Sequence, residues 1–273
     1  MYDCGKITTP EYVVDKGAKL ETIFDRIHLV DTRFEIIRRD AIIHAIRKKL
    51  EEAGKSSVEQ DEQLQQELAR IEVDREYIRR CNIGSEYITP EQIIRINSIA
   101  DNTWQHSSGK NEKLLLDEEA SNLQIGRGTL SVREREIINN HVSVTIKMLE
   151  SLPYPKHLRR LPEYAGGHHE KMDGTGYPHS LTKEEMSIPA RMLAIADVFE
   201  ALTASDRPYK KVMGLAQSLT ILGRMKSEGH VDPDLFDVFI HKQVYLDYAR
   251  QHLKPEQLDV VDIKLIPGYR ALM

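Results

Sequence analysis

The sequence predicts an all-α protein, and three observations carry that prediction. Apolar residues recur at helical spacing along most of the chain, capping signals mark helix starts, and no stretch shows the apolar–polar alternation of a half-buried strand. The chain has 273 residues, of which 40% are hydrophobic and 30% charged, so it is long enough to bury a core. We therefore expect a helical bundle that carries one long antiparallel helical hairpin.

The hairpin is predicted over residues 20–82. Its first helix has an apolar seam at spacings of three and four, made of Leu20, Ile23, Ile27, Val30, Phe34, Ile37 and Ala41. After a polar break at 54–57, a more charged helix carries Leu64, Leu68, Ile71 and Ile78, with Arg75 on the same face. Two partners for the seam stay open, which are another part of this chain and a second copy in a homodimer.

Capping signals and prolines mark the later helices. Capping boxes predict helix starts at Thr89-Pro90-Glu91-Gln92 and at Ser131-Val-Arg-Glu134. The second helix should end near Leu152, because Pro153 follows. Residues 101–112 are polar and predict a loop. Further helices are predicted from Pro162 and over 190–204, 215–225 and 235–249.

Charge and cysteine content exclude several classes of protein. Lys and Arg number 38 and Asp and Glu number 43, a net charge of −5, which argues against general nucleic-acid binding. Cys4 and Cys81 cannot form a disulfide framework, and the longest apolar run is far shorter than a membrane span. The opening residues have no signal-peptide pattern. We expect a cytoplasmic protein without a membrane partner.

Three places carry residues that could meet at a metal ion. His168-His169-Glu170 runs into the loop Asp173-Gly174-Thr175-Gly176-Tyr177-Pro178, His141 lies on the helix that opens at Ser131, and Asp197 lies on the helix 190–204. Imidazoles and carboxylates from several helices suit divalent iron, manganese or zinc.

Other interpretations of these residues stay open. Asp197 shares its face with alanines and needs a partner when buried, which could be a cation or an arginine such as Arg191 or Arg207. His141 could be a hydrogen-bonded core residue, and His168 could cap a helix end.

Two long segments, HHEKMDGTGYP at 168–178 and IPARMLAIADVFEALTASDRPYK at 188–210, resemble the HD-GYP family of metal-dependent phosphohydrolases. The likeness extends over residues 126–250. The segment Tyr2-Asp3-Cys4-Gly5-Lys6 occupies the place of the family's HD-x-G-K motif, which is degenerate here because Tyr2 replaces histidine. His106-Ser-Ser-Gly-Lys110 copies only the outline of that motif and lacks the aspartate. The resemblance implies an HD-type helical bundle.

The resemblance also implies a domain organisation. Residues 1–19 would start the HD-GYP core, 20–82 would be the inserted hairpin, 83–125 a helix and polar linker, 126–250 the main core, and 251–273 a C-terminal tail. In the family, a helix ahead of the HD motif supplies a further ligand, whereas this sequence starts at the motif. We expect either a fragment or late start of a longer protein with upstream sensor modules, or a degenerate member.

Roles for single residues follow from the same resemblance. Asp3 would bridge two metals and Lys6 would donate to a phosphate oxygen, which makes both catalytic. The metal ligands would be Asp3, His141, His168, His169 and Asp197. The substrate contacts would be Tyr177, Pro178, Arg207 and Lys210, and the residues orienting the imidazoles would be Glu170 and Asp173. Because tyrosine is a poor ligand, we expect one well-held ion of the two, with iron or manganese favoured and zinc a further candidate.

Two hypotheses from different classes follow. The first is a metal-dependent phosphodiesterase that hydrolyses cyclic di-GMP to the linear dinucleotide or to GMP, impaired by the lost histidine and upstream helix. The second is a non-catalytic module that binds cyclic di-GMP or docks a partner protein. A phosphohydrolase acting on another nucleotide is a third, because the sequence does not give the shape of a pocket.

Overall fold

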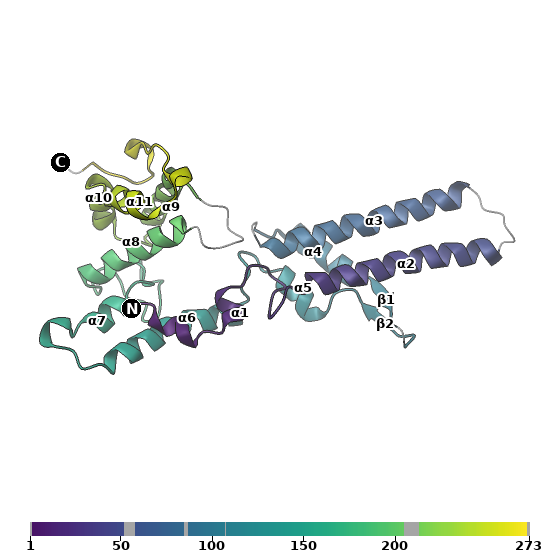
Figure 1. Ribbon diagram of the computed structural model, residues 1–273, viewed down its shortest axis with the longest axis horizontal. Helices are drawn as coiled ribbons and strands as arrows, with labels where there is room; N and C mark the ends of the chain where they lie inside the picture. The colour runs from purple at the N-terminus through teal and green to yellow at the C-terminus, as the bar shows by residue number, and fades with distance from the viewer. Residues whose placement is uncertain (1, 52–57, 85–86, 107, 205–212, 272–273) are drawn as a thin grey trace. The chain divides into compact units, whose positions relative to one another are not determined.

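Helices make up most of the computed structural model, which describes every residue except 1, 52–57, 85–86, 107, 205–212 and 272–273 (Figure 1). The α-helices are α1 (Glu11–Val14), α2 (Ile27–Glu51), α3 (Val58–Ile83), α4 (Pro90–Ala100), α5 (Asp117–Leu123), α6 (Val132–Glu150), α7 (Leu161–Gly166), α8 (Ile188–Thr203), α9 (Leu215–Ser227), α10 (Pro233–His241) and α11 (Val244–His252). Short 3-10 turns lie at η1 (Cys4–Thr8), η2 (Lys156–Leu158), η3 (Pro255–Gln257) and η4 (Ile263–Leu265). The predicted all-α class is confirmed. None of the described helices is both long and apolar enough to cross a bilayer.

The chain divides into two units. The hairpin unit is Pro10–Arg135, and the site unit combines Met1–Thr9 with Glu136–Met273. The first nine residues therefore pack with a part of the chain from which the whole hairpin unit separates them in sequence.

The predicted antiparallel hairpin is present in the hairpin unit as α2 and α3 (Figure 1). Arg75 and Arg79, late in α3, each donate to Asp31, early in α2, at 3.0 Å. Lys49, near the end of α2, pairs with Asp61 near the start of α3. Arg75 can therefore lie on the apolar seam, because Asp31 neutralises its charge.

The first helix begins later than its seam predicts. Leu20 is buried, whereas Ile23 is 94% exposed. Residues before Ile27 turn instead of forming a helix, because Arg26 bonds the carbonyl of Leu20 through both its amide and its guanidinium. The Asp25 carboxylate then accepts from the amide of Ile27 and starts α2.

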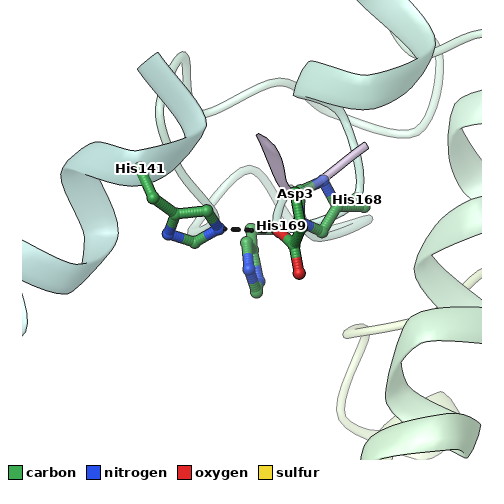
Figure 2. Close-up of side chains that lie close together, drawn as sticks. All are labelled: Asp3, His141, His168 and His169. Carbon is green, nitrogen blue, oxygen red and sulfur yellow. Dashed lines mark hydrogen bonds and ion pairs between the residues drawn. The ribbon is translucent and has the colours of Figure 1, made fainter. Parts of the chain in front are cut away.

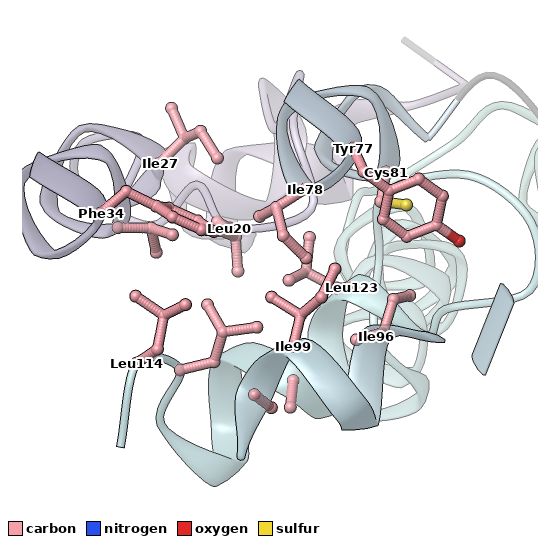
Figure 3. Close-up of a cluster of buried hydrophobic side chains, with 14 of the residues drawn as sticks. Leu20, Ile27, Phe34, Tyr77, Ile78, Cys81, Ile96, Ile99, Leu114 and Leu123 are labelled. Carbon is pink, nitrogen blue, oxygen red and sulfur yellow. The ribbon is translucent and has the colours of Figure 1, made fainter. Parts of the chain in front are cut away.

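The core of the hairpin unit covers much of the apolar seam from within the chain (Figure 3). Val30 and Phe34 of α2 belong to one buried cluster with residues of α4 and α5, such as Ile96 and Leu123. The apolar seam of α2 therefore packs against other parts of the same chain. The homodimer through the hairpin stays a prediction.

A salt bridge joins the beginning and the end of the hairpin unit. Lys16 Nζ lies 2.8 Å from Glu134 Oε1, and the carbonyl of Lys16 accepts from the hydroxyl of Thr129 at 3.1 Å. The Lys16 side chain is buried. Glu134 also closes the predicted capping box, because its carboxylate accepts from the amide of Ser131 at 2.8 Å. The box at Thr89 and Gln92 is present as well.

Two short strands occupy the segment predicted as a loop. β1 (Thr103–Gln105) pairs with β2 (Asn111–Lys113) in antiparallel register, with Trp104 opposite Glu112. Three residues are too few for a visible alternation in the sequence. Beyond the strands, the amide of His106 bonds the carbonyl of Lys110 at 2.8 Å, so these two residues of the second H-x-x-G-K outline continue the pairing of β1 with β2.

In the site unit, helices α8 to α11 enclose the second buried cluster, which includes Phe199, Leu219 and Phe236. The single helix predicted over 235–249 is wrong, because α10 ends at His241 and α11 begins at Val244. Gln243 between them has a φ of 55°. Since glutamine, unlike glycine or proline, is no break signal, the sequence did not reveal the interruption.

Candidate metal centre

Four side chains able to bind a metal meet within the site unit (Figure 2). Asp3 comes from the N-terminal segment, His141 from α6, and His168 and His169 follow α7. Each offers one donor atom, and these atoms all lie within 4.8 Å of one another. The structure thus brings together stretches that lie far apart in sequence.

A close backbone approach at Gly5 holds Asp3 in this cluster. The amide of Gly5 donates to the hydroxyl of Thr145 on α6 at 2.9 Å, one turn beyond His141. A Cβ atom on Gly5 would lie 2.0 Å from the carbonyl oxygen of His141. Only glycine therefore allows the N-terminal segment to approach α6 so closely.

Backbone carbonyls fix the orientation of two of the imidazoles. Nδ1 of His141 bonds the carbonyl of Ile138, and Nδ1 of His168 bonds the carbonyl of Ala165 at 2.5 Å. Since a carbonyl only accepts, each Nδ1 carries the proton, and each neutral ring keeps its lone pair on Nε2. Both Nε2 atoms face Asp3 Oδ1, at 3.0 Å from His141 and 3.2 Å from His168.

The Nε2 atom of His168 shows that this cluster fits a cation. It is buried and has no hydrogen bond of acceptable geometry to any residue that the structure describes, although Asp3 is near. Buried polar atoms without a partner are rare. Two lone pairs and a carboxylate directed at one place repel one another unless a positive charge lies between them. Imidazoles with one carboxylate are the donor set of zinc, iron or manganese sites.

The protonation states of Asp3 and His169 also suit the binding of a metal cation. Burial alone would raise the pKa of the Asp3 carboxyl, but its close contacts with His141, His168 and the Lys6 ammonium hold that pKa well below its usual range. Burial, with His168 and His141 close by, lowers the pKa of His169 to about 3. At neutral pH Asp3 is therefore anionic and His169 is neutral, the forms in which both bind metals.

The predicted substrate contacts are only partly described. The ring of Tyr177 stacks on His169, with centroids 4.8 Å apart and planes 17° apart, and Pro178 follows in the same loop. Burial, with the charge of Asp197, raises the pKa of Tyr177, so its hydroxyl stays protonated. Arg207 and Lys210 lie outside the described residues.

Known proteins match the part of the chain that carries the three histidines of the cluster. Residues 113–235 match the family model described as HD domain. A 3′3′-cGAMP-specific phosphodiesterase of Vibrio cholerae is 45% identical over 78 residues, which are 29% of this chain and 18% of that protein. A cyclic di-GMP phosphodiesterase of Pseudomonas aeruginosa is 47% identical over 73 residues, 27% of this chain and 17% of that protein. One of Thermotoga maritima is 30% identical over 126 residues, 45% of this chain and 33% of that protein.

The HD-domain match and the names of these relatives support membership of the HD-GYP family. It spans a third or less of the length of these three relatives. Asp3 and Lys6 lie outside the residues that match the HD-domain model, so their assignment depends on the geometry described above.

Asp197 does not belong to the group of four side chains that meet in this cluster. Tyr2 lies near Asp197, and burial together with that carboxylate raises the pKa of the Tyr2 hydroxyl. Arg191, one of the two arginines considered for Asp197, pairs with Asp232 instead. The residue that replaces the motif histidine thus lies near a carboxylate predicted to bind metal.

Glu170 and Asp173, which were predicted to orient the imidazoles, contact other groups in the loop that follows His169. Glu170 is fully buried and accepts from the amides of His179 and Leu181, at 2.7 and 2.9 Å. Asp173 accepts from the amide and hydroxyl of Thr175. These carboxylates fold the loop, whereas backbone carbonyls orient the imidazoles. Sequence reasoning missed the carbonyls because no residue type marks them.

Glu170→Ala is expected to lower the free energy of unfolding by about 3 kcal/mol, because it leaves two backbone amides without their charged acceptor. Urea unfolding followed by circular dichroism measures this. Glu184→Ala, at an exposed position of the same segment, should change it by less than about 0.5 kcal/mol. Equal losses in both variants would contradict the role given to Glu170.

Proposed function

We propose that this chain is a metal-dependent phosphodiesterase that hydrolyses cyclic di-GMP to the linear dinucleotide or to GMP. The observation that carries the proposal is the convergence of Asp3 Oδ1 with the Nε2 atoms of His141 and His168, one of them without a hydrogen-bond partner. The substrate class is supported by the relatives, which are named as phosphodiesterases of cyclic di-GMP or 3′3′-cGAMP.

Each residue of the cluster receives a role in this proposal. Asp3, His141, His168 and His169 would hold a divalent ion, with iron or manganese favoured and zinc a further candidate. Such an ion supplies Lewis-acid activation of water and neutralises charge on a phosphate.

Lys6 and Tyr177 would act on the substrate. Lys6 Nζ bonds Asp3 Oδ2 while its side chain is 41% exposed, so the ammonium can reach a phosphate oxygen and stabilise its growing negative charge. Tyr177, beside His169, would present an aromatic surface to a guanine base. Pro178, Arg207 and Lys210 remain proposed substrate contacts.

Metal content and product formation test the proposal together. The purified chain is loaded anaerobically with Fe²⁺ or Mn²⁺, the bound metal is quantified, and cyclic di-GMP and 3′3′-cGAMP are offered in parallel. We expect a linear product or a mononucleotide that forms in proportion to bound metal. A fully loaded protein that binds either nucleotide without product would support the non-catalytic binding module, and one that binds neither would support a protein-docking module.

Tyr2→His is expected to raise the metal content from about one ion per chain toward about two, because it adds an imidazole and frees the Asp197 carboxylate. Tyr2→Phe is the matched control, since it removes the same hydroxyl from beside Asp197 without adding a ligand. Elemental analysis after dialysis gives the stoichiometry. Unchanged metal in Tyr2→His, or an equal rise in Tyr2→Phe, would contradict a ligand role at this position.

The remaining context is also a proposal. We propose a cytoplasmic location, sensor modules or partner proteins upstream, and the division into a hairpin insertion at 20–82 and a main core at 126–250. A homodimer through the hairpin is supported by exposed apolar residues on α2, namely Ile43, Ile46 and Leu50. Sedimentation of the purified chain tests it.

A further inference from the structure

The hairpin unit contains a cavity of about 350 Å³ that shares no residue with the metal centre. Two of its lining residues, Tyr77 and Cys81, come from the end of α3 and are labelled in Figure 3. Its lining includes Lys19, Tyr77, Arg80, Cys81, Ile83 and Ile88. Among the lining residues that the structure describes, none is acidic.

A buried ammonium group gives this cavity its charge. Lys19 is fully buried, and its Nζ donates to the carbonyls of Leu123 and Ile125 at 3.0 and 2.8 Å. An ammonium has three donors, so two carbonyls leave one donor unused. No carboxylate of the described residues forms an ion pair with it. A buried charge of this kind favours an anion beside it.

The surrounding chain holds Lys19 in place. Its backbone amide donates to the carbonyl of Asn82 at 2.8 Å, and the amide of Leu20 donates to the Asn82 side chain at 2.7 Å. The Asn82 amide in turn donates to Asp25 at 2.8 Å. Asn82 is buried, so Lys19 is fixed against the end of α3.

A second cation lies on the wall of the cavity. The guanidinium of Arg80 is 5.9 Å from the centroid of the Tyr77 ring and has no ion pair among the described residues. Ile83 and Ile88 supply apolar surface on the same lining. Two cations, an aromatic ring and two isoleucines together suit a ligand that is anionic at one end and apolar at the other.

We propose that this cavity binds a small organic anion, a carboxylate or a phosphate ester. Its charged group would lie against Arg80, next to the positive charge of the buried Lys19 ammonium, and its apolar part against Ile83 and Ile88. The hairpin unit would then be a ligand-binding module, in addition to any homodimer contact that it makes.

Methyl NMR of the full chain tests this proposal. The isoleucine methyl groups are labelled with carbon-13, and benzoate, phenyl phosphate and neutral benzyl alcohol are titrated in turn. We expect saturable shifts of the Ile83 and Ile88 signals with at least one of the two anions, and binding of benzyl alcohol weaker by roughly tenfold or more. The tighter anion identifies a carboxylate or a phosphate ester. Absence of shifts at these methyls, or equal affinity for benzyl alcohol, would overturn the proposal.

Variants assign the charge preference to named residues. Lys19→Met should remove the preference for the anion over benzyl alcohol. Because Lys19 is buried and its replacement can disturb folding, Arg80→Gln is measured as well. We expect Arg80→Gln to lower the affinity for the anion by about threefold or more. Arg70→Gln, at an exposed position of the same helix, is the matched control and should bind as the native chain does. Equal binding by Arg80→Gln and Arg70→Gln would count against the site, and the metal content should be the same in all of them.

Discussion

His168→Ala is expected to remove divalent-metal binding from the chain and, with it, hydrolysis of any cyclic dinucleotide. The ring is held by the carbonyl of Ala165, so its Nε2 can point only at the cluster. The change removes His168 Nε2, a buried metal-donor atom of the cluster that has no hydrogen-bond partner among the described residues. Only His141 and His169 then remain beside Asp3 as imidazole ligands. Because loss of a residue that merely supports a ligand costs about 10–100-fold in metal affinity, loss of the ligand itself should cost more than about 100-fold.

Metal per chain after dialysis and product formation at saturating Mn²⁺ measure the effect. His179→Ala is the matched control, since that side chain is exposed in the same loop and only its backbone amide is bonded to Glu170. Circular dichroism verifies that both variants keep their helices. A His168→Ala protein that retains full metal content would show that the ligand assignment is wrong.

Gly5→Ala is expected to abolish hydrolysis while leaving the helices of the site unit folded. The new methyl group would lie 2.0 Å from the His141 carbonyl oxygen and 2.7 Å from the Thr145 amide nitrogen, so the N-terminal segment must move away from α6. That movement displaces Asp3 and Lys6 together. Since misplacement by about 1 Å can cost about 100-fold in rate, we expect product formation to fall by at least that factor.

Rates at several metal concentrations separate this loss from a change in metal affinity alone. Gly126→Ala is the matched control, because the nearest atom to a Cβ there is a ring carbon of Tyr87 at 3.8 Å. If Gly5→Ala retained activity like Gly126→Ala, the close approach of the N-terminal segment would have no part in the reaction.

The sequence predicted the helices well where periodicity and capping agree. The hairpin and the boxes at Thr89 and Ser131 are present because they depend on local spacing and on side chains that bond neighbouring amides. The β1–β2 hairpin and the break at Gln243 were missed because neither has a signal in residue type. Ile23 kept the periodicity of the seam but lies outside the helix, since bonds to the Leu20 carbonyl formed a turn there.

For the candidate site, residue types were more informative than their contacts. The four residues that gather, Asp3, His141, His168 and His169, are all among the ligands that the resemblance implied, and their role in metal binding stays a prediction. The position of Tyr2 near Asp197 could not be foreseen, because it depends on where an N-terminal ring lies in space. The hydrogen bond that the Glu170 carboxylate accepts from the His179 amide could not be foreseen either, because it joins a side chain to a backbone atom nine residues away.

The salt bridge between Lys16 and Glu134 bears on how the chain assembles during synthesis. Asp3 leaves the ribosome long before His141, and a long disordered stretch between them would make their meeting slow and entropically costly. Once the hairpin unit has folded, the salt bridge between Lys16 and Glu134 holds its two ends together. The residues before Pro10 and those after Arg135 then start from neighbouring points. The chain that must close between Asp3 and His141 is therefore short in effect, and an insertion of this size need not slow their meeting.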